Sequence, residues 1–373
     1  MAIHRFAFPT TIHFGPGARK LVGAHLQETG CGRPLIVTDK GLAALPVFAD
    51  FRAVLVGLDA GVYCEVHGNP VASQVRAGVD AYRTHRADSV IGFGGGAALD
   101  VAKAIALMVE HPGDVLEYAW DHPQARPIEK PLPHFVALPT TAGTGSEVGR
   151  SAVISDDATH VKRVIFSPAL LARTVFADPE LTLDLPPPIT AATGMDALTH
   201  NIESYLSPAY HPLCDGIALE GVRIASRALP IAVAEPRNLK ARSDMLMASM
   251  MGAIAFQKDL GAVHSCAHAL STVAGLHHGL ANGVMIDHVM RFNRIAATQK
   301  IAELARVAGT SDLVSWLAEL KAKLGIPARL GPLGVKQEQI PRLVDVAHAD
   351  VCHKTNPRPC SKLDFERLFA AAL

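Results

Sequence analysis

Four histidines fall within fifteen positions of the segment GAVHSCAHALSTVAGLHHGLANG, residues 261–283: His264, His268, His277 and His278. His264 and His268 are four residues apart, so on a helix both would project from the same face. Imidazole at this density can bind a metal ion or transfer protons. A histidine pair at this spacing is also common in a solvated surface or a core, so the segment alone does not decide its role.

Asp196 and His200 repeat the four-residue spacing in the earlier segment TGMDALTHNIESY. One carboxylate with up to three imidazoles suits a divalent transition metal such as Fe²⁺ or Zn²⁺, whereas calcium and magnesium require more oxygen ligands. Either pair alone would favour ordinary histidines. The two pairs in one half of the chain together predict a metal site.

A glycine cluster in SVIGFGGGAALDVAKAIA is a candidate phosphate cradle. A predicted strand runs into Gly94, Gly95 and Gly96, and helix-forming residues follow from Ala97. The glycines permit close backbone approach, and free N–H groups at a helix start bind anions. The usual dinucleotide fingerprint also has an acidic residue about 20 positions later, and none is present here. A glycine turn used only for strand-to-helix packing is the alternative.

A second loop, ALPTTAGTGSEVG, follows another predicted strand and is rich in hydroxyl groups and glycines. Its Thr140, Thr141, Thr144 and Ser146 suit a phosphate, a ribose or a nicotinamide amide. Two such loops at the ends of parallel strands predict a nucleotide at the edge of the sheet. Asp39 ends a further strand, where it can accept hydrogen bonds from ribose hydroxyls or cap a helix.

The elements that must position these groups change character along the chain. Short apolar runs alternate with helical stretches in the first half, which predicts a parallel sheet with helical crossovers. After Pro188 the segments are long, rich in Ala, Leu and Met, and helical. We therefore expect an α/β domain over residues 1–184 and an all-helical domain over 185–373. The expected strands are 34–40, 52–58, 88–96, 134–141 and 172–179.

Composition narrows the class of protein. The 373 residues suffice for two domains. Because 35 basic residues balance 35 acidic ones, the chain has no net positive charge to attract nucleic acid. The chain has no run of about 20 apolar residues, so no membrane helix is expected. Its six scattered cysteines and its start without an apolar signal core predict a cytoplasmic protein with reduced thiols.

Several motifs together resemble the iron-containing, or group III, alcohol dehydrogenase family. They occur in family order over nearly the whole chain: Gly94–Gly96 with Asp100 and Lys103, PTTAGTGSE, DALTHNIESY, the histidine stretch with HGLANG, and NPR at 356–358. The resemblance implies a Rossmann-like N-terminal domain, an all-helical C-terminal domain, and NAD(P) with a divalent metal in the cleft between them. It also implies hydride transfer between an alcohol carbon and nicotinamide, with the metal as a Lewis acid.

The resemblance also assigns residues. The implied metal ligands are Asp196, His200, His264 and His278, since His278 is the histidine followed by the family's Gly279 and Asn282. His268 is then the catalytic residue that relays the alcohol proton, and His277 is not a ligand. Asn69 and Cys352 are expected in the substrate pocket. The expected cofactor contacts are Asp39, Gly94, Gly95, Gly96, Ala97, Asp100, Thr140, Thr141, Thr144, Ser146 and Lys162.

We expect NAD rather than NADP, because a 2′-phosphate would repel the Asp39 carboxylate. The expected metal is Fe²⁺, with Zn²⁺ as the alternative. The expected enzyme is a homodimer or larger homo-oligomer acting on a small primary alcohol, diol or hydroxy acid. The departures at Ala97, Ala269 and Ser271 leave the shape of the pocket, and hence the substrate, open.

Other functions compete with this interpretation. A 4-hydroxybutyrate-type hydroxy-acid or semialdehyde dehydrogenase would need a cation for the substrate carboxylate. Arg150 is a candidate, although we expect it to be solvated or salt-bridged. Maleylacetate reductase works without the metal, which the complete ligand set disfavours. Glycerol dehydrogenase and dehydroquinate synthase typically bind their metal through three residues, so the fourth expected ligand argues against both. A non-enzymatic nucleotide- or metal-binding protein would have no use for a pocket histidine.

Overall fold

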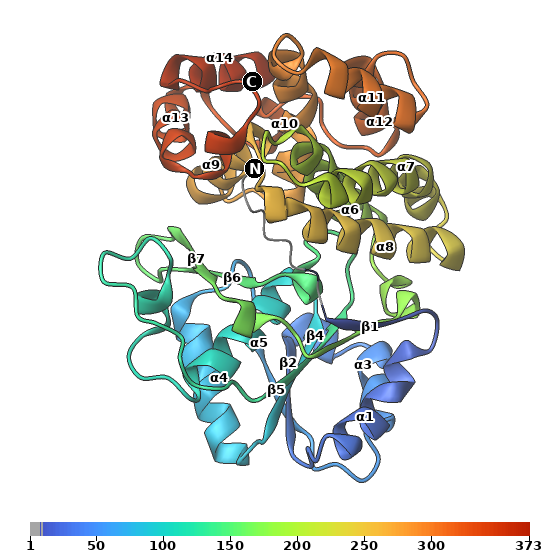
Figure 1. The fold of residues 1–373 in the computed structure, drawn as a ribbon, viewed down its shortest axis with the longest axis vertical. Coiled ribbons are helices and arrows are strands. Elements are labelled where there is room, and N and C mark those ends of the chain that lie inside the picture. Colours follow the sequence, from blue (N-terminus) through green and yellow to red (C-terminus); the bar gives the residue numbers. More distant parts are fainter. Residues whose placement is uncertain (1–7, 9) are drawn as a thin grey trace. The chain divides into compact units, whose positions relative to one another are not determined.

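The computed structural model describes residue 8 and residues 10–373, which form two compact units (Figure 1). An α/β unit ends at Thr182, and a helical unit begins at Leu183. The short segment 142–144 belongs to the helical unit by its contacts, although the sequence around it continues the α/β unit. No helix among these residues is both long and apolar enough to span a bilayer.

The α/β unit is built on a six-stranded sheet in which all pairings are parallel. The strands lie in the order β1-β8-β5-β4-β2-β3. Their bounds are β1 Thr11–Phe14, β2 Pro34–Asp39, β3 Gly61–Val66, β4 Ser89–Gly94, β5 His134–Pro139 and β8 Thr174–Ala177. The inner strands β2, β4 and β5 are buried almost throughout, which explains their continuous apolar sequences.

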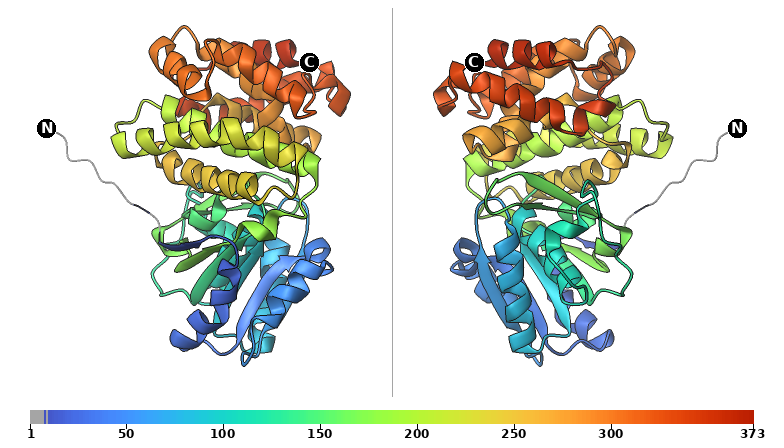
Figure 2. Two further views of the ribbon diagram at one scale, coloured as in Figure 1. Left: turned by 90° about the vertical axis from the view of Figure 1, so that its right-hand side faces the viewer. Right: turned by 90° about the vertical axis from the view of Figure 1, so that its left-hand side faces the viewer.

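Helices cover both faces of this sheet (Figure 2). Helices α1 (Val22–Glu28) and α3 (Pro46–Ala53) pack Leu26 and Phe51 into a core with Phe93 of β4. Helices α4 (Ala72–His85) and α5 (Gly96–Met108) cover the other face. The unit also contains the short helix α2 (Lys40–Ala43) and an antiparallel ribbon of β6 (Ser151–Ser155) and β7 (Lys162–Phe166). Helices on both faces of a parallel sheet confirm the expected Rossmann-like class.

The strand expected over residues 52–58 was wrong. Helix α3 runs through Ala53, and turns follow it up to Leu58. Gly57 has φ +84°, which is incompatible with an extended strand, and Val56 is 78% exposed. The next strand is β3 instead, an edge strand with the sequence GVYCEV in which only Tyr63 and Val66 are buried.

The helical unit contains nine α-helices among the described residues and confirms the all-helical expectation. The central helix is α6 (Pro187–Leu206), which packs against α7, α8 and α10 and is buried along most of its length. The others are α7 Pro212–Ala234, α8 Leu239–Ala255, α9 Ala262–Ala274, α10 His278–Asn293, α11 Thr298–Ala308, α12 Leu313–Lys323, α13 Ile340–Ala349 and α14 Lys362–Ala372.

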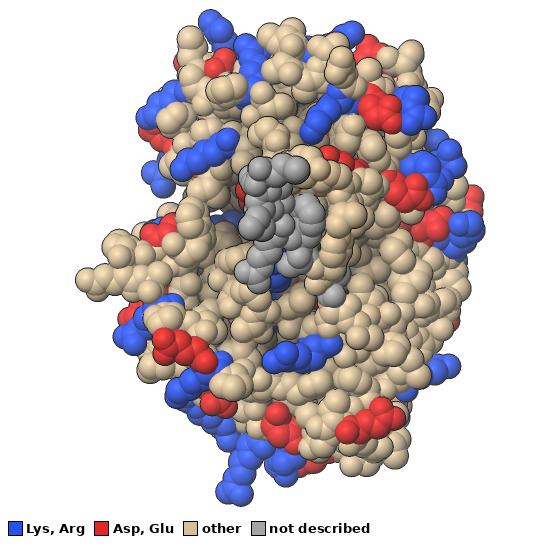
Figure 3. Space-filling view, in the orientation of Figure 1, with Lys and Arg blue, Asp and Glu red and all other residues tan. Residues whose placement is uncertain are grey.

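Two local signals set the break between α9 and α10. Gly275 ends α9 in the left-handed conformation, with φ +67°, and His277 caps the start of α10 by accepting a hydrogen bond from the amide of Leu280. This break places His278 in the first turn of α10. On the molecular face drawn in Figure 3, basic and acidic side chains are interspersed, as the balanced composition predicts.

Candidate active site

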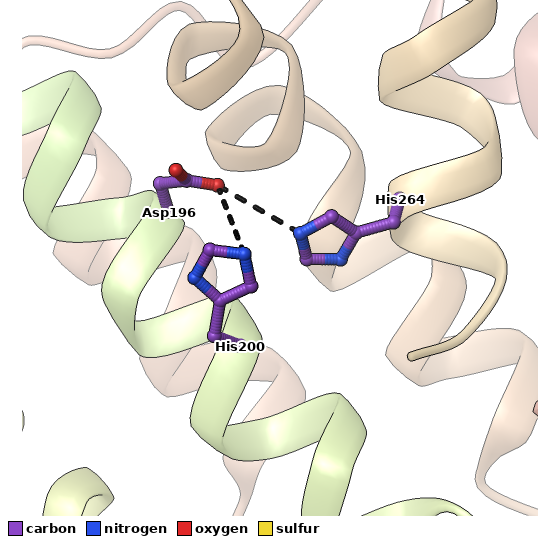
Figure 4. A group of neighbouring side chains, drawn as sticks. All are labelled: Asp196, His200 and His264. Atoms are coloured by element: carbon purple, nitrogen blue, oxygen red, sulfur yellow. Dashed lines mark ion pairs between the residues drawn. The ribbon is translucent and has the colours of Figure 1, made fainter. Parts of the chain in front are cut away.

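Three imidazoles of the helical unit gather around the carboxylate of Asp196. Asp196 and His200 project from one face of α6, and His264 comes from α9 (Figure 4). The Nε2 atoms of His200, His264 and His278 lie 3.9, 3.8 and 3.5 Å from Asp196 Oδ1. The structure therefore brings together the whole set that the family resemblance implies.

Burial keeps the His200 imidazole suited to metal binding. Asp196, His200 and His264 are all buried, and burial lowers the pKa of His200 to about 4. A neutral imidazole has a free lone pair on one ring nitrogen, which is the form that binds a metal. The His278 side chain is more open, at 23% exposure. Solvent therefore reaches the cluster more easily at His278 than at Asp196, His200 or His264.

Hydrogen bonds on the far side of two rings fix the tautomers that metal binding requires. His264 Nδ1 lies 2.6 Å from Glu203 Oε2, and His200 Nδ1 lies 3.3 Å from the carbonyl oxygen of Gly143. Both partners are acceptors, so each Nδ1 carries the proton and each Nε2 is left as the ligand atom. The contact with Gly143 also explains why the segment 142–144 belongs to the helical unit.

Glu203 has a second task at the start of α9. Its Oε1 accepts a hydrogen bond from the amide of Val263 at 2.7 Å, and its Oε2 accepts one from the amide of Gly261 at 3.1 Å. The side chain is almost fully buried. A single carboxylate thus satisfies free N–H groups of the helix start and holds the ring of His264.

Asn282 touches the cluster from α10. Its Nδ2 donates to Asp196 Oδ1 at 2.6 Å and lies 3.4 Å from His264 Nε2 and 3.2 Å from His278 Nε2. Asn282 is fully buried, and its Oδ1 has no hydrogen-bond partner within the part of the chain that the structure describes. One amide therefore faces three of the four expected ligands.

The donor set fits a divalent transition metal. One carboxylate oxygen and three imidazole nitrogens converge, two of the imidazoles have their tautomers set by acceptors, and the site is largely enclosed. The oxygen-rich shell that calcium prefers is absent from this cluster of described residues. His277 instead serves as the helix cap described above.

His268, the expected catalytic residue, lies beside the cluster. Its ring stacks on that of His278, with centroids 5.2 Å apart, and its Nδ1 lies 2.8 Å from Asp350 Oδ2. Cys352, which was expected in the substrate pocket, is close to both: one ligand-type atom from each of His268, Asp350 and Cys352 lies within 4.8 Å of the others. Burial raises the pKa of the Cys352 thiol well above its usual value, so the thiol stays protonated.

In the α/β unit, the expected cofactor residues meet at the carboxyl edge of the sheet. Gly94 ends β4 and pairs with Pro139 of β5, and the amide of Thr140 donates to the carbonyl oxygen of Gly94 at 3.0 Å. Gly95 precedes α5, whose first turn contains Gly96 and Ala97. A Cβ on Gly95 would lie 3.2 Å from the Thr141 side chain, so there is little space for a side chain at position 95. This loop can approach a phosphate closely.

Asp39 ends the neighbouring strand β2 at the same edge, as expected for a ribose contact. Its Oδ1 also accepts a hydrogen bond from the amide of Leu42 at 2.8 Å, which caps α2. The alternative role as a helix cap is therefore present in the structure. Asp39 therefore caps α2 through Oδ1 and also lies at the end of β2, where the ribose contact was expected.

Asp100 and Ser146 belong to an internal network that links α5 with the second loop. Ser146 Oγ donates to Asp100 Oδ1 at 2.6 Å, and Lys103 Nζ donates to Ser146 Oγ at 2.9 Å. Lys162 contributes favourable charge at Asp100 from β7. Glu147 is buried next to this network, and burial raises its pKa to about 7 against the opposing charge of Lys103. This network ties the two expected phosphate loops together.

The remaining expected site residues are dispersed. Thr144 lies in the helical unit. Asn69 is exposed in the loop after β3. The Arg150 guanidinium lies over the Phe166 ring, 5.4 Å from its centroid, in a cation–π contact.

Three residues of the site were missed as contributors from sequence. Glu203 lies three residues after His200 and Asn282 lies four residues after His278, so helical spacing could have placed both beside the ligands. Asp350 carries no such signal, because it lies 82 positions from the histidine that it contacts.

Two family models match most of the chain. Residues 9–179 match the model of the iron-containing alcohol dehydrogenases, and residues 190–373 match the C-terminal model of the same family. The chain is 38% identical to 4-hydroxybutyrate dehydrogenase of Cupriavidus necator and 37% identical to 1,3-propanediol dehydrogenase of Citrobacter freundii, with 98% of each chain covered in both cases.

Solved structures give the same result. A 1,3-propanediol oxidoreductase superimposes with a TM-score of 0.94 at 35% identity over 100% of both chains. Sulfoacetaldehyde reductase from Bifidobacterium kashiwanohense, in complex with NAD⁺, gives a TM-score of 0.90 at 30% identity, covering 100% of this chain and 99% of that one. The chain therefore belongs to the iron-containing alcohol dehydrogenase family and is an oxidoreductase of the alcohol dehydrogenase type.

Proposed function

We propose that the protein is an NAD-dependent alcohol dehydrogenase and aldehyde reductase that uses one Fe²⁺ ion per chain. The observation that carries the proposal is the convergence of three imidazole Nε2 atoms within 3.9 Å of Asp196 Oδ1 in a buried site. Asp196, His200, His264 and His278 would hold the ion. When bound, it would supply a Lewis acid that polarises the substrate oxygen, and Zn²⁺ would be the alternative ion.

His268 is the residue that moves the alcohol proton. Its ring lies against His278, and its Nδ1 is bonded to Asp350, so Nε2 is the atom left to exchange a proton. Imidazole is the side chain that most often serves as a general acid or base in enzymes. Cys352, next to this pair, and Asn69 are assigned to the substrate pocket.

The NAD assignment rests on the carboxyl edge of the sheet. The start of α5 after Gly95 suits the pyrophosphate, and Thr140 and Thr141 suit the ribose or nicotinamide. Gly94, Gly96, Ala97, Asp100, Thr144, Ser146 and Lys162 complete the proposed cofactor contacts. Asp39 would accept hydrogen bonds from ribose hydroxyls and would repel a 2′-phosphate, which favours NAD over NADP. A structural relative in complex with NAD⁺ supports the same choice.

The proposed substrate is a small primary alcohol or diol and the matching aldehyde. Two relatives are named for 1,3-propanediol, and another for 4-hydroxybutyrate, so a hydroxy acid is the second candidate. The engagement of Arg150 with Phe166 makes that arginine less available to a substrate carboxylate. The six cysteines form no disulfide, which supports a cytoplasmic location, and we expect a homodimer or larger homo-oligomer.

A substrate screen with controlled metal content tests the proposal. Protein loaded with Fe²⁺ or Zn²⁺ is assayed with short alcohols, diols, 4-hydroxybutyrate and their aldehydes, using NAD(H) and NADP(H). The expected result is NADH oxidation with a short aldehyde, lost after chelation and restored by Fe²⁺. Equal turnover before and after complete metal removal would refute the proposal and would favour a metal-free reductase.

A further inference from the structure

The segment that follows α13 holds α9 at both ends of its histidine pair. Thr355 Oγ1, in the short 3₁₀-helix Cys352–Thr355, donates to the carbonyl oxygen of Leu260 at 2.9 Å. Asn356, the first residue of the NPR motif, accepts a hydrogen bond from the amide of Ala262 at 3.2 Å. Asp350 contacts His268, which lies one turn after His264 on α9. The segment 350–356 and Glu203 therefore both contact the helix that carries His264 and His268.

The Asp350 carboxylate is itself held by donors that differ on its two oxygens. Oδ1 accepts hydrogen bonds from Ser265 Oγ at 2.7 Å and from the amide of Cys352 at 2.9 Å. Oδ2 accepts one from His268 Nδ1 at 2.8 Å. Burial alone would raise the pKa of Asp350, but His268, Ser265 and the Cys352 amide outweigh burial and lower it. The group is an ionised carboxylate in a fixed orientation.

We propose that Asp350 is a positioning residue for proton transfer at His268: it holds His268 in the Nδ1–H tautomer and keeps its ring stacked on His278. The inference rests on the proposed function for its catalytic consequence, whereas the tautomer follows from the contacts alone. A carboxylate can only accept, so the shared proton lies on His268 Nδ1 and the lone pair lies on Nε2. Only Nε2 can then receive the proton of the alcohol.

A second metal site is a weaker explanation for the cluster of His268, Asp350 and Cys352. Although His268, Asp350 and Cys352 offer three ligand-type atoms close together, the Cys352 thiol stays protonated, and both oxygens of the carboxylate already accept hydrogen bonds. The arrangement matches that of a carboxylate that orients a catalytic histidine, where loss of the carboxylate charge produces the wrong tautomer.

Asp350→Asn is the informative substitution because the orientation of the new asparagine amide can be predicted. The amide of Cys352 is a fixed donor, so the asparagine oxygen must stay at the position of Oδ1. Its NH₂ group then faces His268 Nδ1, which can accept only if the imidazole proton moves to Nε2. The expected result is a switch of His268 from the Nδ1–H to the Nε2–H tautomer, read from ¹⁵N chemical shifts of histidine-labelled, Zn²⁺-loaded protein. The His268 signals are assigned by their loss in His268→Gln.

Steady-state kinetics on the same proteins gives the second measurement. We expect Asp350→Asn to lower kcat by a factor on the order of a hundred while KM changes by less than about twofold and metal content stays at the wild-type level. Ser265→Ala removes one donor to Asp350 and should leave the tautomer unchanged. Asp345→Asn, at an exposed carboxylate that pairs with Lys362, is the matched control and should leave both readouts unchanged.

The outcomes separate the two claims. An Nε2–H tautomer in the wild type, or an Nδ1–H tautomer retained in Asp350→Asn, overturns the inference even if the enzyme is active. If Asp350→Asn does not fold, the wild-type tautomer still decides. If wild-type protein shows no NAD-linked turnover of any alcohol or aldehyde, the proposed function fails, and the tautomer measurement still tests the role of Asp350.

Discussion

Replacing Glu203 with glutamine should weaken metal binding without removing a ligand. The carboxylate accepts from the amides of Gly261 and Val263 and from His264 Nδ1. A glutamine can keep its oxygen at Oε2, where two of these donors meet, and its NH₂ group then faces the Val263 amide. One buried backbone donor is thereby left unsatisfied, which costs about 1–3 kcal/mol of stability.

The His264 ring would keep its tautomer but lose its anionic partner. Outer partners of ligating histidines typically contribute tenfold to a hundredfold in metal affinity, so we expect the dissociation constant of Zn²⁺ to rise by about that factor, or about 1.4–2.7 kcal/mol. Competition with a chromogenic chelator at fixed pH measures it, and circular dichroism confirms folding. Glu303→Gln, at an exposed carboxylate paired with Arg306, is the control. A folded Glu203→Gln protein that binds Zn²⁺ within twofold of wild type would refute the reasoning.

Three further predictions concern other parts of the molecule. His278→Ala should lose metal and turnover, whereas His277→Ala should keep both; metal analysis showing the reverse would mean that the neighbouring histidines are assigned wrongly. Asp39→Gly should remove a repulsion that disfavours NADP by roughly tenfold to a hundredfold, and should therefore raise NADP use while weakening NAD binding; an unchanged cofactor preference in steady-state kinetics would contradict this role. Glu147→Gln should stabilise the fold at pH 8 but not at pH 4. Burial raises the pKa of Glu147 to about 7 in the folded state, so the wild-type free energy of unfolding is highest below the unfolded pKa near 4.5 and falls by about 3 kcal/mol as the pH rises towards 7. If the substitution changes the melting temperature equally at pH 4 and pH 8, this prediction is contradicted.

The predictable parts of the fold are those in which local sequence and burial agree. Strands β2, β4 and β5 are inner strands of a parallel sheet, so they appear as continuous apolar runs. Edge strand β3 lacks such a run, and the apolar residues before it belong to the end of α3 and a turn, which produced the wrong strand at 52–58. Apolar content alone does not distinguish a strand from a helix end, because both bury residues.

The pairing of two proposed ligands, Asp196 and His200, was accessible from sequence because helical periodicity places them on one face of a helix. The choice between His277 and His278 needed the family resemblance, and the structure relates it to the helix start at His278. Asp350 could not be found in this way, because its contact with His268 depends on packing of α13 and the following segment against α9. Partners that are distant in sequence depend on the tertiary fold.

The most direct test of the central claim is a metal titration of chelator-stripped protein under anaerobic conditions. We predict that NAD-linked alcohol oxidation rises linearly with added Fe²⁺ and reaches a plateau at about one ion per chain, because one carboxylate and three imidazoles form one site. The Asp196→Ala protein should show no such rise. Full activity in the stripped wild-type protein, or an unchanged titration in Asp196→Ala, would contradict the account.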